Sequence, residues 1–209
     1  MENYTKYRLK DYGELADLLE GKDNLFVIAC NKCFKEFETN NEPDCEAFLK
    51  LAEGLDKTIT GTAKADFLCN KYKAVKNLPD MIPEGTEHVV VISCGLGIQT
   101  VAEIADLPVY AASNSINYTG HHGMALTKKA CDACAQCYLN MTGGICPIVD
   151  CSKSLINGQC GGAKDGKCEV DPSMECGWER IYQKLKKLGR LDVLKCPIQL
   201  RDYAKDDKV

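Results

Sequence analysis

Eight of the 14 cysteines in the chain fall between Cys131 and Cys176, in a glycine-rich segment with almost no apolar periodicity. Such a segment cannot build a hydrophobic core of its own, so bonds to a metal or a cluster would have to hold it. Disulfides are the weaker explanation, because 209 residues with 45% hydrophobic content can bury a core without cross-links. The sequence therefore predicts a cysteine-rich segment that folds around metal.

The cellular compartment affects how these cysteines should be interpreted. The first six residues are acidic and polar, whereas a signal peptide begins with a basic stretch and continues with an apolar one. The longest apolar run, residues 89–92, is far shorter than the roughly 20 residues needed to cross a bilayer. We therefore expect a soluble, cytoplasmic protein without membrane contact, in which clustered cysteines are metal ligands or redox groups.

The net charge of the chain and the absence of common motifs argue against several classes of function. A net charge of −4 and a pI near 5.5 provide no basic surface for nucleic acid, so protein partners are favoured. The run Gly95-Leu96-Gly97 follows a predicted strand, but Thr100 stands at its third glycine position and no acidic residue follows at the ribose-binding distance. The chain also lacks a phosphate-binding loop and a serine nucleophile motif.

Residues 1–125 are predicted to form an α/β domain, because apolar strand-like runs alternate with helical patterns. Such alternation favours a small parallel-type sheet with flanking helices. The expected strands are residues 25–29, 58–60, 88–93 and 109–111, and the expected helices begin after Pro43 and at Ile98. Residues 126–209 are predicted to form a cysteine-rich, cluster-binding segment followed by a C-terminal amphipathic helix over residues 178–188, which Gly189 ends.

The most specific cysteine pattern is Cys131, Cys134 and Cys137, a C-x2-C-x2-C run. Bacterial ferredoxins place three thiolates of one iron–sulfur cluster at this spacing and follow them with a Cys-Pro pair. Here the pair is Cys146-Pro147, and eight residues separate it from Cys137 instead of three. The fourth ligand is therefore open between Cys146, Cys151 and a more distant cysteine, of which we take Cys176. Zinc and disulfides are the alternatives for this set.

A second set consists of Cys146, Cys151, Cys160 and Cys168, with glycines interleaved. Four thiolates suit a second [4Fe–4S] cluster or a closed zinc site, and spacing alone separates these poorly. The glycines let backbone amides approach sulfur closely, which favours iron. A structural zinc site remains the alternative.

A third set lies in the predicted α/β domain: Cys30, Cys33, Cys69 and Cys94. Because the carboxyl ends of parallel strands meet at one edge of a sheet, these four thiolates are expected to form a cluster site there. The alternatives are a thioredoxin-like C-x-x-C pair at Cys30 and Cys33, and ordinary buried cysteines.

The remaining candidates are isolated. Cys45 lies on the apolar face of a predicted helix and is expected in the core, and Cys196 has no companion. The pair His121 and His122 lies between two glycines, in a turn that more often displays histidines to solvent or a partner than to a metal. None of these four residues is placed among the ligands.

Residues 143–147, 151–162 and 166–169 resemble the methylenetetrahydrofolate reductase C-terminal-type domain. The chain looks like the free-standing form of this domain, the MetV family of small iron–sulfur subunits that accompany a flavin-bearing reductase in acetogenic bacteria. Cys30-x2-Cys33, Cys69 and Cys94-Gly-Leu-Gly are also similar to that family, so the resemblance extends over most of the chain. Gln159 departs from the expected proline, at a position that holds no ligand.

The resemblance implies a non-catalytic electron-transfer subunit of an oxidoreductase heteromer in one-carbon metabolism, the Wood–Ljungdahl pathway. Two or three [4Fe–4S] clusters would relay electrons to or from FMN, which only the large partner subunit carries. A further electron-donating iron–sulfur or flavin subunit is a candidate second partner. One alternative is a zinc-binding structural or regulatory subunit of the same complex, with zinc in place of a cluster. Another is a thiol–disulfide enzyme that uses Cys30 and Cys33.

Overall fold

The computed structural model describes residues 6–34, 37–38, 42–117 and 131–205. The centre of the fold is a parallel four-stranded sheet in the order β5-β2-β6-β7, as the sequence predicts. Its strands are β2 (Leu25–Cys30), β5 (Ile59–Ala65), β6 (His88–Ile92) and β7 (Val109–Ala111). The helices that connect or flank them are α1 (Tyr12–Leu19), α2 (Glu42–Gly54), α3 (Lys71–Met81) and α4 (Gly95–Ile104).

Two short antiparallel pairs flank this sheet. One joins β1 (Lys6–Leu9) to β8 (Ser113–Asn117), and the other joins β3 (Lys32–Phe34) to β4 (Phe37–Glu38). Strand β8 follows β7 directly and therefore continues the chain from the sheet toward the cysteine-rich segment. At this junction the Ser113 side chain bonds to the backbone of Ser93. The Ser93 N–H donates to Ser113 Oγ at 3.0 Å, and Ser113 Oγ donates to the Ser93 carbonyl at 2.7 Å.

Each central strand is buried on both faces, which explains its continuous apolar run. In β2, Phe26 and Ile28 pack toward a cluster that includes residues of α3 and α4, whereas Leu25 and Val27 pack toward α1 and α2. The same alternation occurs in β6. Cys45 lies in the second of these clusters, so the prediction that it is a core residue is confirmed.

The C-terminal wrap, residues 131–205, is mostly irregular chain with several short helical turns and one longer helix. The turns are η1 (Leu139–Met141), α5 (Pro147–Asp150) and η2 (Leu191–Lys195), and η3 (Tyr203–Lys205) ends the described chain. The predicted amphipathic helix is α6 (Gly177–Lys187), which buries Trp178, Ile181 and Leu185. The predicted domain boundary near residue 125 lies outside the described residues.

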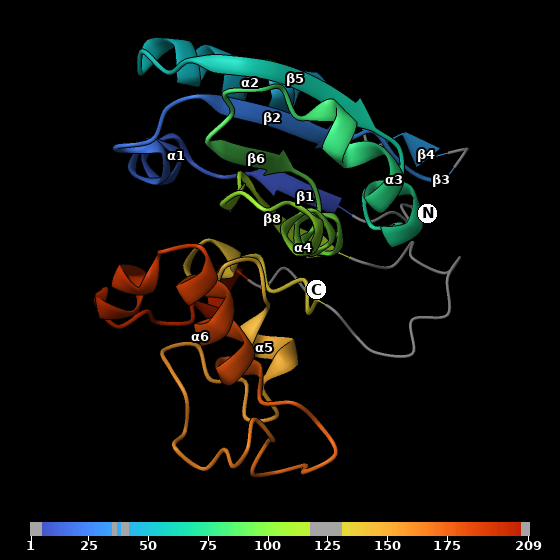
Figure 1. The fold of residues 1–209 in the computed structure, drawn as a ribbon. Helices are drawn as coiled ribbons and strands as arrows, with labels where there is room; N and C mark the ends of the chain where they lie inside the picture. Colours follow the sequence, from blue (N-terminus) through green and yellow to red (C-terminus); the bar gives the residue numbers. More distant parts are fainter. Residues whose placement is uncertain (1–5, 35–36, 39–41, 118–130, 206–209) are drawn as a thin grey trace.

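The wrap packs against the body at α4 and β7, and α4 lies between the sheet and the wrap (Figure 1). The Asn140 side-chain amide accepts from the Ala111 N–H at 2.6 Å and donates to the Ala111 carbonyl at 3.2 Å, as a neighbouring strand would. Gly144, at φ +88°, approaches Ala102 so closely that an added Cβ would lie 2.1 Å from the Ala102 Cβ. Lys184 Nζ donates to the Ala102 carbonyl at 2.6 Å. None of the described helices is long and apolar enough to cross a membrane.

Candidate metal centre

Four cysteines of the wrap line one cavity, here called cavity A: Cys131, Cys134, Cys137 and Cys146. The first three come from the C-x2-C-x2-C loop, and Cys146 is the residue before α5. Gly95, Gln99, Ser115 and Tyr138 complete much of its wall. Cavity A therefore collects the ferredoxin-like run and one further cysteine around a shared space.

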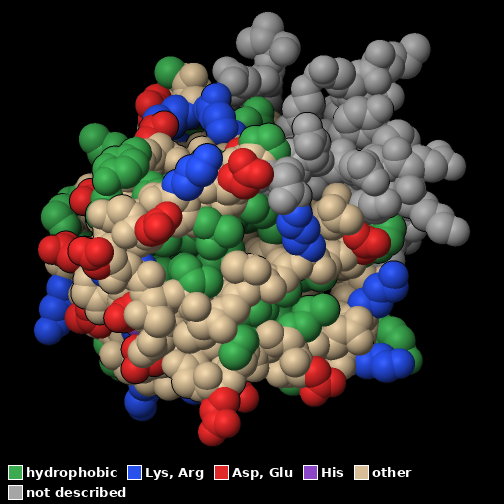
Figure 2. All heavy atoms as spheres, turned by 90° about the horizontal axis from the view of Figure 1, so that it is seen from above, with side chains coloured by type: hydrophobic (Ala, Val, Ile, Leu, Met, Phe, Trp, Pro, Cys, Tyr) green, Lys and Arg blue, Asp and Glu red, His purple; other side chains and the backbone are tan. Residues whose placement is uncertain are grey.

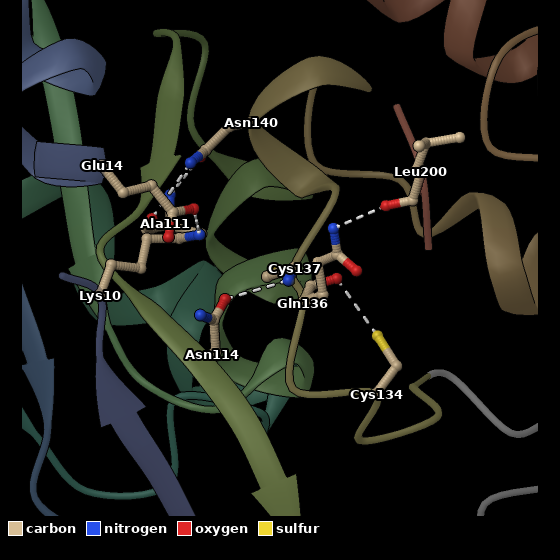
Figure 3. Close-up of polar contacts among 9 residues, drawn as sticks. All are labelled: Lys10, Glu14, Ala111, Asn114, Cys134, Gln136, Cys137, Asn140 and Leu200. Atoms are coloured by element: carbon tan, nitrogen blue, oxygen red, sulfur yellow. Dashed lines mark hydrogen bonds and ion pairs between the residues drawn. The ribbon is translucent and has the colours of Figure 1, made fainter. Parts of the chain in front are cut away.

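Strand β8 holds the cysteine loop in place. The Cys137 N–H donates to Asn114 Oδ1 at 3.0 Å (Figure 3), and the Ala135 N–H donates to the Ser115 carbonyl at 3.0 Å. Ala133 and Ala135 occupy the gaps between the cysteines at φ 48° and 52°, in the left-handed region that non-glycine residues rarely adopt. These two bends, fixed by bonds to β8, turn the loop back on itself within seven residues.

The start of α4 forms the opposite wall. An added Cβ on Gly95 would lie 2.8 Å from Cys131 Sγ, so only glycine leaves this thiol its place. The Gly95 N–H donates to Ser115 Oγ at 2.7 Å. Because α4 begins here, the positive end of its dipole is directed at the cavity, which favours negative charge such as a thiolate.

Burial makes three thiols of cavity A poor acids in the chain alone. It raises the pKa of Cys137 and of Cys146 to about 12, and it also raises the pKa of Cys134. Burial, followed by the charge of Cys134, raises the pKa of Tyr138 to about 12. A bound metal would therefore have to displace thiol protons, and its binding is coupled to their release.

A second cavity, cavity B, is lined by Cys151, Cys160, Cys168 and Cys176. It is closer to solvent, since Cys160 is exposed whereas Cys176 is buried. Several donors reach its sulfurs: Ser152 Oγ lies 3.3 Å from Cys168 Sγ, and the Gly162 N–H donates to Cys160 Sγ at 3.5 Å. The Ser152 hydroxyl and then backbone N–H groups lower the pKa of Cys168.

The structure groups these eight cysteines differently from the sequence expectation, which paired Cys176 with the ferredoxin-like run and Cys146 with the second set. Helix α5 is the reason, because it begins after Cys146 and ends before Cys151, and so separates one cavity from the other by a single turn. Cys176 is held beside Cys168 instead, through bonds from the Cys176 N–H to the Gly166 carbonyl at 2.8 Å and from the Cys168 N–H to the Met174 carbonyl at 3.0 Å.

Residues 110–204 match a family model described as methylene-tetrahydrofolate reductase C terminal. This part of the chain is therefore similar to the methylene-tetrahydrofolate reductase C-terminal-type domain. The match begins in β7 and takes in β8 and α6, and it includes the eight cysteines that line the two cavities as well as Cys196. No curated protein compared with the chain matches it.

Three cysteines outside the matched range lie near the carboxyl edge of the sheet. Cys30 ends β2, Cys94 immediately follows β6, and Cys69 lies between β5 and α3. Cys30 and Cys94 are buried, and Cys69 is half-buried. The side chain of Cys33 lies outside the described residues, as do His121 and His122, so the four-cysteine site predicted here stays a prediction. Cys196 is exposed and lines neither cavity.

Among the described residues, no three side chains of His, Cys, Asp or Glu are close enough to hold a single metal ion. Ligands of a zinc site each lie about 2.3 Å from one ion, which brings all four sulfurs close together. Eight cysteines of the wrap line the two cavities, four in each.

The C-terminal strap, residues 196–205, crosses the loops of both cavities. The Gln136 side-chain amide donates to the Leu200 carbonyl at 3.0 Å (Figure 3) and accepts from the Asp202 N–H at 2.9 Å. The Asn157 side-chain amide makes the same pair of bonds with Gln199, at 2.9 and 2.8 Å. The strap thus ties the cavity A loop to the cavity B loop.

Sequence reasoning missed five residues of this centre: Gly95, Asn114, Ser115, Gln136 and Tyr138. Gly95 was considered as part of a nucleotide-binding motif and of the Cys94-Gly-Leu-Gly stretch, but not as a wall of the cysteine site. The other four are common polar residues whose roles arise from contacts with distant segments, so the sequence carries no comparable signal for them.

Proposed function

We propose that this chain is the electron-transfer iron–sulfur subunit of a methylenetetrahydrofolate reductase complex, a member of the MetV family. In this role it relays electrons to or from the FMN of the large catalytic subunit, in the Wood–Ljungdahl pathway of one-carbon metabolism. The observation that carries the proposal is cavity A, where a C-x2-C-x2-C run and a fourth cysteine surround one space inside a domain of the reductase C-terminal type.

The residues of both cavities fit iron–sulfur clusters. Four cysteine thiolates are the usual ligands of a [4Fe–4S] cluster, and each cavity offers four. Gly95 leaves room beside Cys131 that a larger residue would fill, and the buried Tyr138 hydroxyl in the cavity wall has no partner among the described residues. We assign Cys131, Cys134, Cys137 and Cys146 to one cluster and Cys151, Cys160, Cys168 and Cys176 to another.

When bound, a cluster supplies one-electron transfer, whereas hydride transfer belongs to a flavin. The chain's own residues position and shield the two sites. Leu139 and the body exclude water from cavity A, and α5 holds Cys146 and Cys151 five positions apart, which is about 8 Å at a helical rise of 1.5 Å per residue. Two sites so close can exchange electrons directly. The sheet-edge cysteines Cys30, Cys33, Cys69 and Cys94 are proposed to hold a third cluster.

The proposal places catalysis and folate on the partner. The flavin-bearing large subunit is the first partner, and a further electron-donating iron–sulfur or flavin subunit is the second. Nucleic acid is not expected: on the face drawn in Figure 2, Lys and Arg side chains are interspersed with Asp and Glu and form no single basic patch. The proposed location of the complex is the cytoplasm, where reducing conditions keep cysteines available for metal.

A zinc-binding structural or regulatory subunit is the second candidate, and cavity B favours it. Cys160 is exposed there, and its thiol donates to Glu169 Oε2 at 3.3 Å beside the Lys153–Glu169 ion pair at 2.6 Å. An accessible site with polar neighbours suits a closed structural zinc as well as a cluster.

Anaerobic purification of the chain and a count of iron, zinc and acid-labile sulfide decide between these functions. Two [4Fe–4S] clusters give about eight iron and eight sulfide per chain, and a third raises both to about 12. Visible absorbance should bleach on reduction. Colourless protein that carries zinc alone would end the electron-transfer proposal.

Substitution of single cysteines tests the assignment. Cys134→Ser and Cys146→Ser should each remove the cluster of cavity A and about half of the iron of a two-cluster chain, while Cys196→Ser, at an exposed cysteine outside both cavities, should remove none. The first two variants should also unfold part of the wrap and leave the α/β body folded. Unchanged iron in Cys134→Ser would show that the site lies elsewhere.

A further inference from the structure

Tyr138 directly follows Cys137 and lines cavity A together with the four cysteines. Only 5% of its surface is exposed. Its hydroxyl oxygen is buried and has no hydrogen-bond partner among the residues that the structure describes. Buried hydroxyl groups in folded proteins almost always have a partner, so this one indicates that an acceptor belongs in the cavity.

The neighbours of Tyr138 narrow the choice of acceptor. Cys134 is the cavity cysteine whose charge acts on the Tyr138 hydroxyl. In the chain alone the Cys134 thiol is itself a donor, since its Sγ donates to the Gln136 carbonyl at 3.2 Å. On the strap, Asp202 Oδ1 accepts from the Ala204 N–H at 3.0 Å, and among the described residues the Tyr138 hydroxyl makes no bond to this carboxylate. A metal-bound sulfur differs from a free thiol, because it has lost its proton and can only accept.

We propose that the Tyr138 hydroxyl donates a hydrogen bond to a sulfur of the group bound in cavity A and thereby raises the reduction potential of that group. The inference rests on the proposed function, in that the group is an iron–sulfur cluster. Reduction adds one negative charge to a cluster, and a donor to sulfur stabilises the more negative state more strongly. Tyr138 remains a neutral phenol throughout and acts only as a donor.

Tyr138→Phe removes the hydroxyl and keeps the ring that fills the wall. Tyr182→Phe is the matched control, because it makes the same change on α6 at a side chain that is 42% exposed. Each purified protein is titrated anaerobically with a reductant while absorbance and electron paramagnetic resonance are followed. The signal of cavity A is the one that Cys134→Ser eliminates.

We expect Tyr138→Phe to retain its iron and sulfide and to make reduction of the cavity A cluster about tenfold less favourable, which is about 59 mV for one electron. Tyr182→Phe should leave this potential unchanged. Full iron content with an unshifted potential in Tyr138→Phe overturns the inference and leaves the proposed function intact. Unaltered protein that binds only zinc overturns both.

A second measurement covers the case in which Tyr138→Phe loses its iron. Growth with 3-fluorotyrosine makes every tyrosine hydroxyl a stronger donor without removing any, so the potential of the cavity A cluster should rise. An unchanged potential in the fluorinated protein overturns the inference.

Discussion

Residue 95 meets two demands, and the second favours glycine. It begins α4 and gives its N–H to Ser115 Oγ, and it faces Cys131 Sγ at a distance that leaves no room for a side chain. A nucleotide-binding explanation for this glycine is unnecessary, because the approach of a cysteine from 36 positions later in the chain already requires it. The same backbone turn places Cys94 at the sheet edge and Gly95 in cavity A.

Gly95→Ala should therefore disrupt cavity A. The new Cβ would displace Cys131, and we expect metal or iron bound at this cavity to fall severalfold while cavity B keeps its own. Elemental analysis of the purified variant measures this loss. Gly54→Ala is the matched control, since no atom lies within 4 Å of the position its Cβ would take. Equal metal content in the two variants would contradict the close approach described here.

At this scale the sequence predicts local spacing well and distant contacts poorly. Cys131, Cys134 and Cys137 could be grouped because two-residue gaps keep them together in any compact loop. The choice between Cys146 and Cys176 as the companion in cavity A could not be made, because it depends on how one turn of helix and one loop are oriented. The place of Tyr138 in the cavity wall could not be predicted either, since nothing in its type or position distinguishes a cavity-lining tyrosine from a core tyrosine.

Helix α6 stabilises the wrap through a small apolar cluster. Leu185 is fully buried there with Ile181 and Trp178, and the Trp178 Nε1–H donates to the Leu155 carbonyl at 2.8 Å. The cluster joins the helix to the loop of cavity B, because Cys151 and Leu155 pack against it. The buried face of α6 is thus the apolar face that its sequence pattern predicts.

Leu185→Ala should destabilise the wrap by about 2–5 kcal/mol, the usual cost of a cavity at a buried leucine. Denaturant unfolding followed by Trp178 fluorescence measures the loss. Tyr182→Ala, on the same helix with 42% of its side chain exposed, should cost far less. Equal losses would mean that α6 does not pack as described.

The turn before β2 contains a carboxylate that makes stability depend on pH. Asp23 Oδ1 accepts from the Thr58 N–H at 2.6 Å, and this backbone donor lowers the pKa of Asp23 from its ordinary value of 3.8. A lowered pKa stabilises the fold above the ordinary value, and the contribution is lost as the pH falls through the lowered one. Asp23→Asn should therefore reduce the melting temperature at neutral pH, with a difference that shrinks as the pH falls below 3.8. A difference that stays constant from neutral to acid pH would contradict this role of Asp23.

The elements recovered from sequence are those with strong apolar runs. Strands β2, β6 and β7 were predicted because burial on both faces makes them continuously apolar. The start of β5, at the edge of the sheet, was also predicted, although its side chains are only partly buried. Strands β1 and β8 were missed, since β8 reads Ser-Asn-Ser-Ile-Asn and owes its extended form to pairing with β1. Helix α3 was missed as well, because its composition is polar and Pro79 lies inside it.

The whole molecule divides its stability unequally between body and wrap. The body has two apolar clusters, one on each face of the sheet, and both are closed by helices. The wrap has one cluster with four buried members, two of which adjoin or belong to cavity B. Its remaining attachments are hydrogen bonds such as those of Asn140 with Ala111 and of the strap with Gln136.

The unequal stability of body and wrap predicts how the chain responds to the removal of metal. Chelation under reducing conditions should leave the body folded and loosen the loops of residues 131–176. The bonds from cysteine to metal, which hold these loops in place of a hydrophobic core, are then absent. Hydrogen exchange with mass spectrometry checks it: protection should fall by at least tenfold over these loops and stay within about twofold in β2 and β6. The Leu185→Ala variant separates the contribution of the apolar cluster from that of metal binding, since it weakens the cluster and leaves the cysteines unchanged. If the bonds from cysteine to metal contribute most of the stability of the wrap, the loops of metal-loaded Leu185→Ala should be better protected than those of the unaltered chain without metal. The reverse order would assign the stability of the wrap to its apolar cluster.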